Sequence, residues 1–305
     1  SNVSATHGHG TAVSGLIGAT HNNALGIAGV SRQVEIVPMK IGPGPELSIG
    51  AAIEAYGRAQ ASGVRVANLS FSVTCPSVAV REALAAASSV LFVAAAGNQS
   101  ANVYLEPRYP CTYDLANVLC VGASTSRDLL AGFSNWGEGV DIYAPGTDLR
   151  TTSAGGGYEY FSGTSGSAPV TSGAAAEIIA AKPSLSPAYL RQLLIGSADR
   201  VAAGPRLNLS RALLVIDYTT PETVIIAAPN KALSQRPSFI FSSSELDASF
   251  QCRLDYGGWF GCAEQWRPEQ KLARKRHRID VRSIDLAGNA DPSPATKYFT
   301  IAKKP

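Results

Sequence analysis

The chain has 305 residues, of which 45% are apolar and only 16% charged, so it is long enough for two ordinary domains and can bury a sizeable core. Its formal net charge of +3 is too small to indicate nucleic acid or a membrane surface as a partner, and neither is expected. No apolar run reaches about 18 residues, so no membrane span is predicted. Neither an initiating Met nor a signal peptide is present, and we expect a processed or truncated chain.

The first two thirds of the chain alternate strand and helix patterns. Strands are predicted at 34–41, 64–70, 90–96, 118–122 and 140–143, and helices at 49–61, 78–87, 165–181 and 187–198. The run 90–96 is almost wholly apolar, as expected of a strand covered on both faces. This alternation predicts an α/β fold with a mostly parallel sheet and helices on both faces. Functional groups in such folds gather beyond the carboxyl ends of the strands.

The pattern changes at a Pro- and Thr-containing segment near Asp217, after which helical periodicity disappears. Short alternating strands are predicted at 238–242, 249–254, 278–284 and 297–301, separated by turn sequences such as Tyr256-Gly-Gly258. Regular short strands with such turns predict a small all-β sandwich. The predicted domains are therefore 1–216 and 217–305.

A basic run at 271–278 resembles a patch that binds nucleic acid or heparin. It spans a turn and the start of an alternating strand, on which Arg276, Arg278 and Arg282 would share the outward face. We therefore interpret the run as the solvated face of a sheet.

The five cysteines form two close pairs and one remainder. Cys111 and Cys120 bracket one short loop, and Cys252 and Cys262 bracket another. Such pairs indicate local disulfides in an exported protein, each worth about 2–3 kcal/mol if unstrained, although buried free thiols are the alternative. Cys75 is left over, and an odd cysteine suggests a missing partner. A secreted or extracellular location is expected, and cell-surface association is compatible with it.

Three short segments carry residue types suited to nucleophilic catalysis. Ser165 stands at a predicted helix start, where unpaired backbone N–H groups can stabilise an oxyanion, although a helix N-cap is an equal alternative. Pro169 is expected in the first helical turn, where its missing N–H does no harm. His9, in the glycine-flanked Gly8-His-Gly10, is a candidate general base, with His7 and His21 as alternatives.

Asn98 follows the apolar strand at 90–96, where its side-chain amide can point an N–H at a developing oxyanion. A turn-forming asparagine is the alternative. In chain order and surroundings, the segments around His9, Asn98 and Ser165 resemble the subtilisin-like serine proteases, or subtilases, over roughly residues 4–214. Further matching segments are 22–30, 66–70, 133–137, 140–146 and 158–170.

This resemblance implies a serine endopeptidase that acts through an acyl-enzyme. It assigns His9 as general base, Ser165 as nucleophile and Asn98 as the oxyanion-hole side chain, with Thr164 and the Ser165 backbone N–H assisting. It also implies roles in substrate binding. Ser70, Phe71 and Ser72 would pair with the substrate backbone as an added strand, and Ala95 and Gly97 would form a wall of the first specificity pocket.

The chain departs from the family in three ways. Phe71-Ser-Val-Thr-Cys75 replaces a glycine-rich segment and could narrow the substrate groove, and Gly166 puts a small residue beside the nucleophile. The expected aspartate ahead of His9 is absent, since none of the eight preceding residues is acidic. Because that aspartate orients the histidine and ends an interior strand, we expect this chain alone to be inactive or very weak and to fold poorly.

The resemblance implies a polypeptide substrate, with the chain's own pro-segment as a second partner, and a monomer is expected. No cofactor is expected, although family members often bind calcium near Asn22 and Asn23, where no carboxylate is present. The part from Phe250 to Pro292 resembles a bacterial immunoglobulin-like repeat, which implies binding, anchoring or spacing. A non-catalytic surface adhesion protein with a decayed protease domain is the alternative, against which the joint retention of His9, Asn98 and Ser165 argues.

Overall fold

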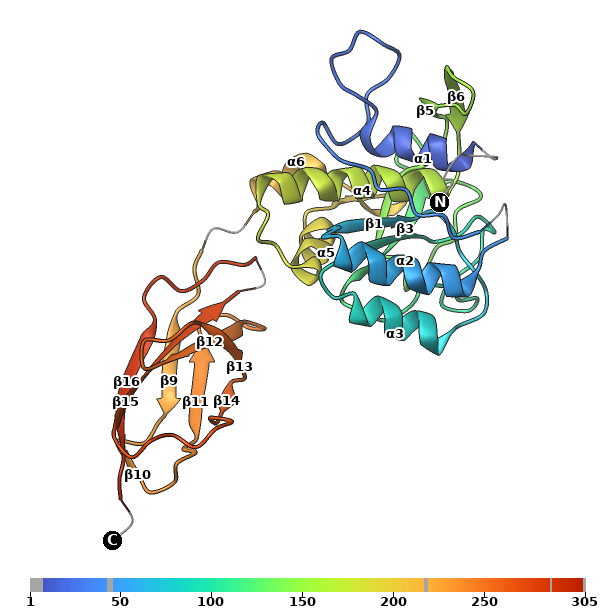
Figure 1. Cartoon of the computed structure of the whole chain (residues 1–305). Helices are drawn as coiled ribbons and strands as arrows, with labels where there is room; N and C mark the ends of the chain where they lie inside the picture. Colours follow the sequence, from blue (N-terminus) through green and yellow to red (C-terminus); the bar gives the residue numbers. More distant parts are fainter. Residues whose placement is uncertain (1–7, 43–45, 217–218, 286, 304–305) are drawn as a thin grey trace. The chain divides into compact units, whose positions relative to one another are not determined.

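The computed structural model describes residues 8–42, 46–216, 219–285 and 287–303 (Figure 1). The chain divides into two compact units. The first comprises Ser1–Pro183 and Pro187–Ile216, and the second comprises Ser184–Ser186 and Asp217–Pro305.

A six-stranded sheet with the order β1-β2-β3-β4-β8-β7 forms the centre of the first unit. Neighbouring strands from β1 to β8 pair in parallel, and only β7 runs antiparallel to its neighbour β8. The bounds are β1 Val66–Leu69, β2 Leu91–Ala95, β3 Val118–Ser124, β4 Ile142–Pro145, β7 Asp199–Val201 and β8 Gly204–Arg206. Every residue of β2 and β3 is buried, as the apolar run at 90–96 predicted.

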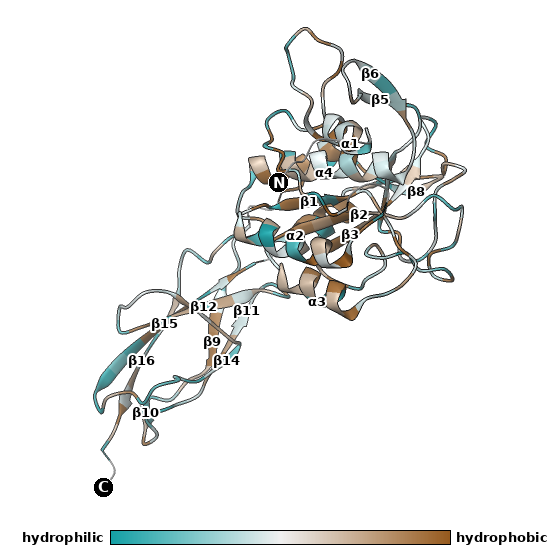
Figure 2. Cartoon of the chain, turned by 45° about the vertical axis from the view of Figure 1, so that its right-hand side comes forward, coloured by the Kyte–Doolittle hydropathy of each residue, from teal (hydrophilic) through white to brown (hydrophobic). Residues whose placement is uncertain are grey.

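Helices cover both faces of this sheet (Figure 1). On one face, α2 (Ile49–Ala61) and α3 (Val78–Ala86) bury apolar side chains against β2 and β3. On the other face, α4 (Thr164–Ala181) lies along β1 to β4, and α1 (His9–Gly18) packs on α4. Figure 2 shows the hydrophobic residues concentrated on the central strands between these layers. The predicted α/β architecture is therefore confirmed for this unit.

The strand predicted at 34–41 is wrong, because the structure has no strand in this segment. A strand persists only where a neighbour takes up its backbone hydrogen bonds, and none of these residues joins a ladder. Pro38 also removes one donor. The segment stays largely exposed, with Val37 48% accessible. β1 pairs directly with β2, from Val66 opposite Leu91 to Leu69 opposite Ala94, and is an edge strand of the sheet.

Several short elements of the structure were not predicted from the sequence. They are the hairpin of β5 (Leu149–Thr152) and β6 (Tyr158–Phe161), the β7–β8 hairpin, α6 (Leu209–Leu214) and, in the second unit, β9, β10, β13 and β14. The β5–β6 turn contains three successive glycines at 155–157, all with positive φ. α5 (Pro187–Gly196) follows α4 as predicted. None of the described helices is long and apolar enough to cross a bilayer.

The second unit contains two sheets, and its described residues form no helix. One sheet has the order β10-β16-β15-β12-β13 and the other β14-β11-β9. Their bounds are β9 Thr223–Ala227, β10 Lys231–Ala232, β11 Phe239–Ser243, β12 Ser249–Leu254, β13 Phe260–Cys262, β14 Gln265–Trp266, β15 Arg276–Ile284 and β16 Ala295–Ile301. Phe239 and Phe241 of one sheet share a buried core with Ile279 and Phe299 of the other.

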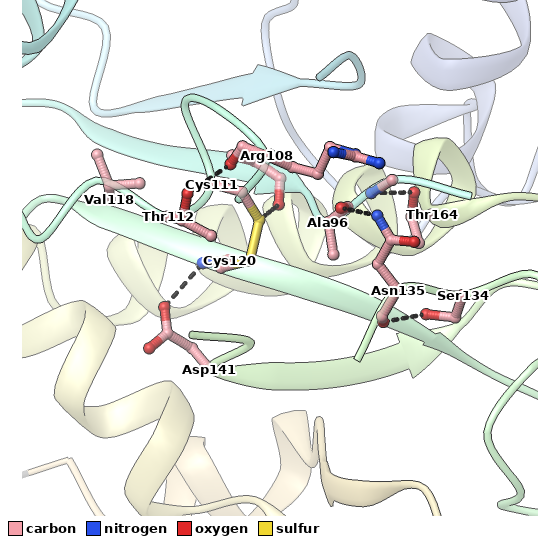
Figure 3. Close-up of a disulfide and its surroundings, with 12 residues drawn as sticks. Ala96, Arg108, Cys111, Thr112, Val118, Cys120, Ser134, Asn135, Asp141 and Thr164 are labelled. Atoms are coloured by element: carbon pink, nitrogen blue, oxygen red, sulfur yellow. Dashed lines mark hydrogen bonds between the residues drawn. A yellow bond between two sulfur atoms is a disulfide. The ribbon is translucent and has the colours of Figure 1, made fainter. Parts of the chain in front are cut away.

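Both cysteine pairs form disulfides. Cys111 is joined to Cys120 at the start of β3, and Cys252 of β12 is joined to Cys262 of β13. Figure 3 shows the first of these beneath the loop that follows β2. Cys75 is a free and exposed thiol.

Candidate active site

The candidate residues converge at the carboxyl ends of β1 and β2. Ser70 follows β1 directly, Asn98 comes three residues after β2, and Ser165 is the second residue of α4. The carboxyl ends of parallel strands meet at one edge of a sheet, so segments far apart in sequence become neighbours there.

Ser165 and Ser70 form two reciprocal hydrogen bonds. The Ser165 hydroxyl donates to the Ser70 carbonyl at 3.3 Å, and the Ser70 hydroxyl donates to the Ser165 carbonyl at 2.9 Å. The second bond has a cause in the sequence. A helical carbonyl normally accepts from the N–H four residues later, and for Ser165 that residue is Pro169, which has none.

The predicted position of Pro169 in the first turn is wrong, because α4 already begins at Thr164 and Pro169 is its sixth residue. The proline therefore leaves the Ser165 carbonyl without its helical partner, and Ser70 supplies the donor instead. Asn68 and Ser172 extend the network. The Asn68 amide donates to the Ser70 hydroxyl at 2.9 Å, and the Ser172 hydroxyl donates to Asn68 Oδ1 at 3.0 Å.

Thr164 fixes the orientation of Asn98. The Thr164 backbone N–H and hydroxyl both donate to Asn98 Oδ1, at 2.8 and 2.9 Å, and the Thr164 hydroxyl oxygen accepts from the Gly97 N–H at 3.1 Å. With its oxygen engaged in this way, Asn98 presents its Nδ2 donor on the other side. A Cβ added to Gly163 would lie 3.4 Å from that nitrogen, so the donor faces the start of α4. Both donors of Thr164 are thus directed at Asn98.

A buried asparagine holds the loop after β2 through hydrogen bonds. Asn135 is fully buried and donates to the Ala96 carbonyl at 2.8 Å (Figure 3). It also accepts from the Gln99 N–H at 2.9 Å. Gln99 Oε1 accepts from the Asn98 N–H at 3.1 Å and from Arg108 Nε at 3.2 Å. The sequence alone indicates no role for Asn135, because the hydrogen-bond partners of its side-chain amide lie more than 30 residues away.

His9 is the first residue of α1, and its ring packs edge-on against Phe161 of β6 with centroids 5.5 Å apart. Among the described residues, no hydrogen bond joins His9 to Ser165 or to a carboxylate. Part of the ring remains solvent-exposed, but desolvation by neighbouring protein atoms lowers the pKa of His9. The neutral imidazole, which is the form that accepts a proton, is thereby favoured.

The two alternative histidines are placed differently. His21 Nε2 is hydrogen-bonded to the Gly29 carbonyl at 2.7 Å, which ties it to its own loop. His7 lies outside the described residues.

The proposed substrate-binding residues surround the same edge. Phe71 and Ser72 follow Ser70 and are half-buried. Phe71 lines an apolar cavity together with side chains from α2 and its neighbourhood, namely Ile49, Ala52, Tyr56, Val73 and Val80. Ala95 is only 2% exposed, so almost none of its surface is available to a ligand. At Gly97, with φ of 101°, an added Cβ would lie 2.5 Å from Asn135 Nδ2, so no larger residue fits.

The loop containing Asn22 and Asn23 is a poor match for calcium, which prefers several carboxylate and carbonyl oxygens. Asn23 Oδ1 already accepts from the Leu25 N–H at 3.0 Å. The described parts of the chain contain no group of three or more His, Cys, Asp or Glu side chains that could hold a metal ion.

Comparison with known proteins identifies the family of the first unit. Residues 1–218 match a family model described as Subtilase family. Subtilisin Savinase of Lederbergia lenta is 38% identical over 203 residues, covering 65% of this chain and 72% of that protein. Alkaline elastase YaB of Bacillus sp. (strain YaB) is 37% identical over 204 residues, covering 66% of this chain. The chain spans about half, 52%, of that relative.

Solved structures are similar to the same part of the chain. One is the crystal structure of a cold adapted subtilisin-like serine proteinase, with a TM-score of 0.59 and 31% identity, covering 67% of this chain and 75% of that one.

Proposed function

We propose, since the chain belongs to the subtilase family, that it is a serine endopeptidase with Ser165 as nucleophile, His9 as general base and Asn98 as oxyanion donor. The observation that carries the proposal is the pair of Thr164 hydrogen bonds that hold the Asn98 oxygen and leave Nδ2 free beside the nucleophile's helix.

In the first half-reaction, Ser165 Oγ bonds to the substrate carbonyl carbon while its proton moves to the His9 imidazole. The carbonyl oxygen becomes an oxyanion, which receives hydrogen bonds from Asn98 Nδ2 and from the Ser165 backbone N–H at the start of α4. Collapse breaks the peptide C–N bond, and the leaving amine takes the proton from His9. Water then attacks the acyl-serine with His9 again as base, which releases the acid.

Since no described carboxylate contacts His9, we expect low turnover from this chain as it stands. Loss of the orienting carboxylate from such a triad costs on the order of 10⁴ in rate. The lowered pKa of His9 keeps its imidazole neutral to a lower pH than in an ordinary histidine, but it also makes that imidazole a weaker base.

The substrate is proposed to be a polypeptide that adds as a strand to the segment Ser70–Ser72 at the end of β1. The apolar cavity beside Phe71 suits an apolar substrate side chain. No cofactor is proposed for the reaction, and the donor set near Asn23 gives no support for a calcium site.

The second unit is proposed to be an immunoglobulin-like sandwich whose role is to bind a ligand, to anchor the protein or to act as a spacer. Two disulfides, one in each unit, support export to an oxidising compartment. By resemblance to the family, a pro-segment is proposed as a partner and a monomer as the working state; self-association would arise only where the edge strand β1 is left uncovered.

Labelling with a fluorophosphonate tests the assignment of the nucleophile. Intact-mass analysis should show one adduct on the unmodified chain, none on Ser165→Ala, and an unchanged adduct on the exposed control Ser126→Ala. Equal labelling of Ser165→Ala would refute the role of Ser165. Failure of the folded, unmodified chain to label at all would favour the alternative of a non-catalytic binding protein, for which the specific observation is that no described carboxylate contacts His9.

A further inference from the structure

The outward face of one sheet in the second unit carries a concentration of arginines. Cross-strand registers place Arg253 opposite Asp280 and Gln251 opposite Arg282 on β12 and β15. On β15 and β16, they place Arg278 opposite Tyr298 and Arg276 opposite Thr300. We call Arg253, Arg276, Arg278 and Arg282, with the rings beside them, the arginine face. The alternate residues of β15, such as His277 and Ile279, are buried in the core.

The positive charge of this face is not balanced within the described structure. Asp280 is its one buried acid, and it accepts from Arg253 at 3.1 Å and from Arg278 at 2.7 Å. Arg276 and Arg282 have no carboxylate partner among the described residues. Same-face neighbours on a strand are about 7 Å apart, so the guanidinium groups repel one another. An anionic ligand would relieve that repulsion.

Aromatic rings hold the guanidinium groups in place. Trp259 is contacted by Arg253 at 4.6 Å and by Arg282 at 4.4 Å from its ring centroid. Arg276 lies 4.5 Å from the Tyr298 centroid, and Arg278 lies 4.7 Å from that of Tyr256. Stacked arginines lose little further freedom on binding an anion, and their planar forks suit carboxylate and sulfate groups.

Two polar contacts add to this arrangement. Both Arg282 Nε and Nη2 donate to Gln251 Oε1, at 3.0 and 2.7 Å, which leaves the Gln251 amide nitrogen as a further donor on the same face. The Thr296 hydroxyl donates to Asp280 Oδ1 at 2.6 Å, which gives the buried carboxylate a further hydrogen bond and leaves the charge of the exposed arginines unchanged.

We propose that the arginine face binds an acidic polysaccharide. Exposed rings such as Tyr256 and Tyr298, 67% and 44% accessible, offer flat apolar surfaces for sugar rings, and the arginines complement carboxylate or sulfate substituents. The Cys252–Cys262 disulfide lies in the same sheet and favours an oxidising location outside the cytosol, so a polysaccharide rather than a nucleic acid is the proposed occupant. The structure places Arg276, Arg278 and Arg282 on the outward face of the sheet, as predicted, and the proposal adds a ligand for that face.

Titration of the full chain with polygalacturonate, at low and high salt, tests the proposal. Binding should be detectable, weaken as salt rises, and exceed binding to neutral dextran and to an oligothymidine of similar length. Arg276→Gln with Arg282→Gln should reduce affinity about tenfold or more. The same loss of two charges in Arg236→Gln with Lys271→Gln, outside the face, should leave affinity nearly unchanged.

Further variants separate folding from binding. Within the described residues Arg276 and Arg282 form no ion pair, and their other contacts lie on the exposed face, so the double variant should keep its thermal unfolding midpoint to within a few degrees, which is measured alongside. Trp259→Phe should retain binding but lose most of the ligand-induced fluorescence change. The proposal is overturned if polygalacturonate does not bind, if both double variants lose affinity equally, or if oligothymidine binds more tightly than the polysaccharide.

Discussion

At the scale of single residues, the site depends on groups that do not react. The backbone N–H and the hydroxyl of Thr164 both donate to Asn98. The Ser70 hydroxyl donates to the Ser165 carbonyl in place of the N–H that Pro169 lacks. The reacting side chains are oriented by neighbours whose own hydrogen bonds are already committed. Substitution of these neighbours should therefore impair labelling of Ser165 while leaving the fold intact.

Thr164→Val provides such a test. The substitution keeps the shape of the side chain but removes the hydroxyl that joins Asn98 to Gly97. We expect the second-order rate of fluorophosphonate labelling to fall about 10²-fold, the size of effect found when an oxyanion donor is lost. Thr164→Ser keeps the hydroxyl and should restore most of the rate. A Val variant that labels at the unmodified rate would show that Thr164 does not position Asn98.

In the second unit, Asp255 couples stability to pH. Burial raises its pKa, but hydrogen bonds from the Arg278 N–H and from His277, with the charges of His277 and Lys275, outweigh burial and hold the pKa below its usual value. The carboxylate therefore stabilises the folded state above its unfolded pKa of about 3.9, and this contribution is lost as pH falls through the lower folded value.

Denaturation by urea at pH 5 and at pH 3 measures this contribution. The unmodified chain should lose stability in the second unit between these values, and Asp255→Asn should be less stable at pH 5 and less sensitive to the change. If the variant shows the same difference between pH 5 and pH 3 as the unmodified chain, Asp255 is not a source of the pH dependence.

At the scale of elements, the sequence predicts what depends on local pattern. The apolar run at 90–96 gave β2, and the capping serines at 48 and 77 precede α2 and α3, whose predicted bounds are confirmed to within a residue. The segment 34–41 has an equally good strand pattern, yet forms none, because pairing depends on a partner from elsewhere. For the same reason Asn68 and Asn135 were missed, since their roles rest on contacts far apart in sequence.

Two glycines of α1 give a matched test of how this helix is placed. A Cβ at Gly15 would lie 2.3 Å from Thr152 Oγ1 and 3.0 Å from Thr152 N, whereas a Cβ at Gly10 meets nothing within 4 Å. Gly15→Ala should destabilise the first unit by about 1–3 kcal/mol through overpacking. Gly10→Ala should be neutral or stabilise it by about 0.5–1 kcal/mol, since alanine favours helix. Limited proteolysis of the first unit measures the difference, and equal cleavage rates for the two variants would contradict the tight packing of α1 on β5.

At the scale of the whole molecule, the first unit presents an edge strand, β1, and several exposed apolar side chains, among them Val34, Ile36 and Val37. Open edges and exposed apolar groups favour association. We therefore expect this chain in isolation to self-associate and to unfold without a sharp transition in its first unit. Light scattering and calorimetry on the purified chain check this, and a monodisperse monomer with a cooperative transition at an ordinary temperature would contradict it.

The hydrogen bonds between Ser70 and Ser165 have one more consequence. The Ser165 hydroxyl donates to the Ser70 carbonyl, an acceptor that a peptide strand added at Ser70–Ser72 would also use. If the peptide N–H replaces the hydroxyl at that carbonyl, the hydroxyl can rotate toward an imidazole, while the bond from the Ser70 hydroxyl to the Ser165 carbonyl still joins the two segments. Binding of the peptide and release of the nucleophile's hydrogen would then be coupled through one carbonyl.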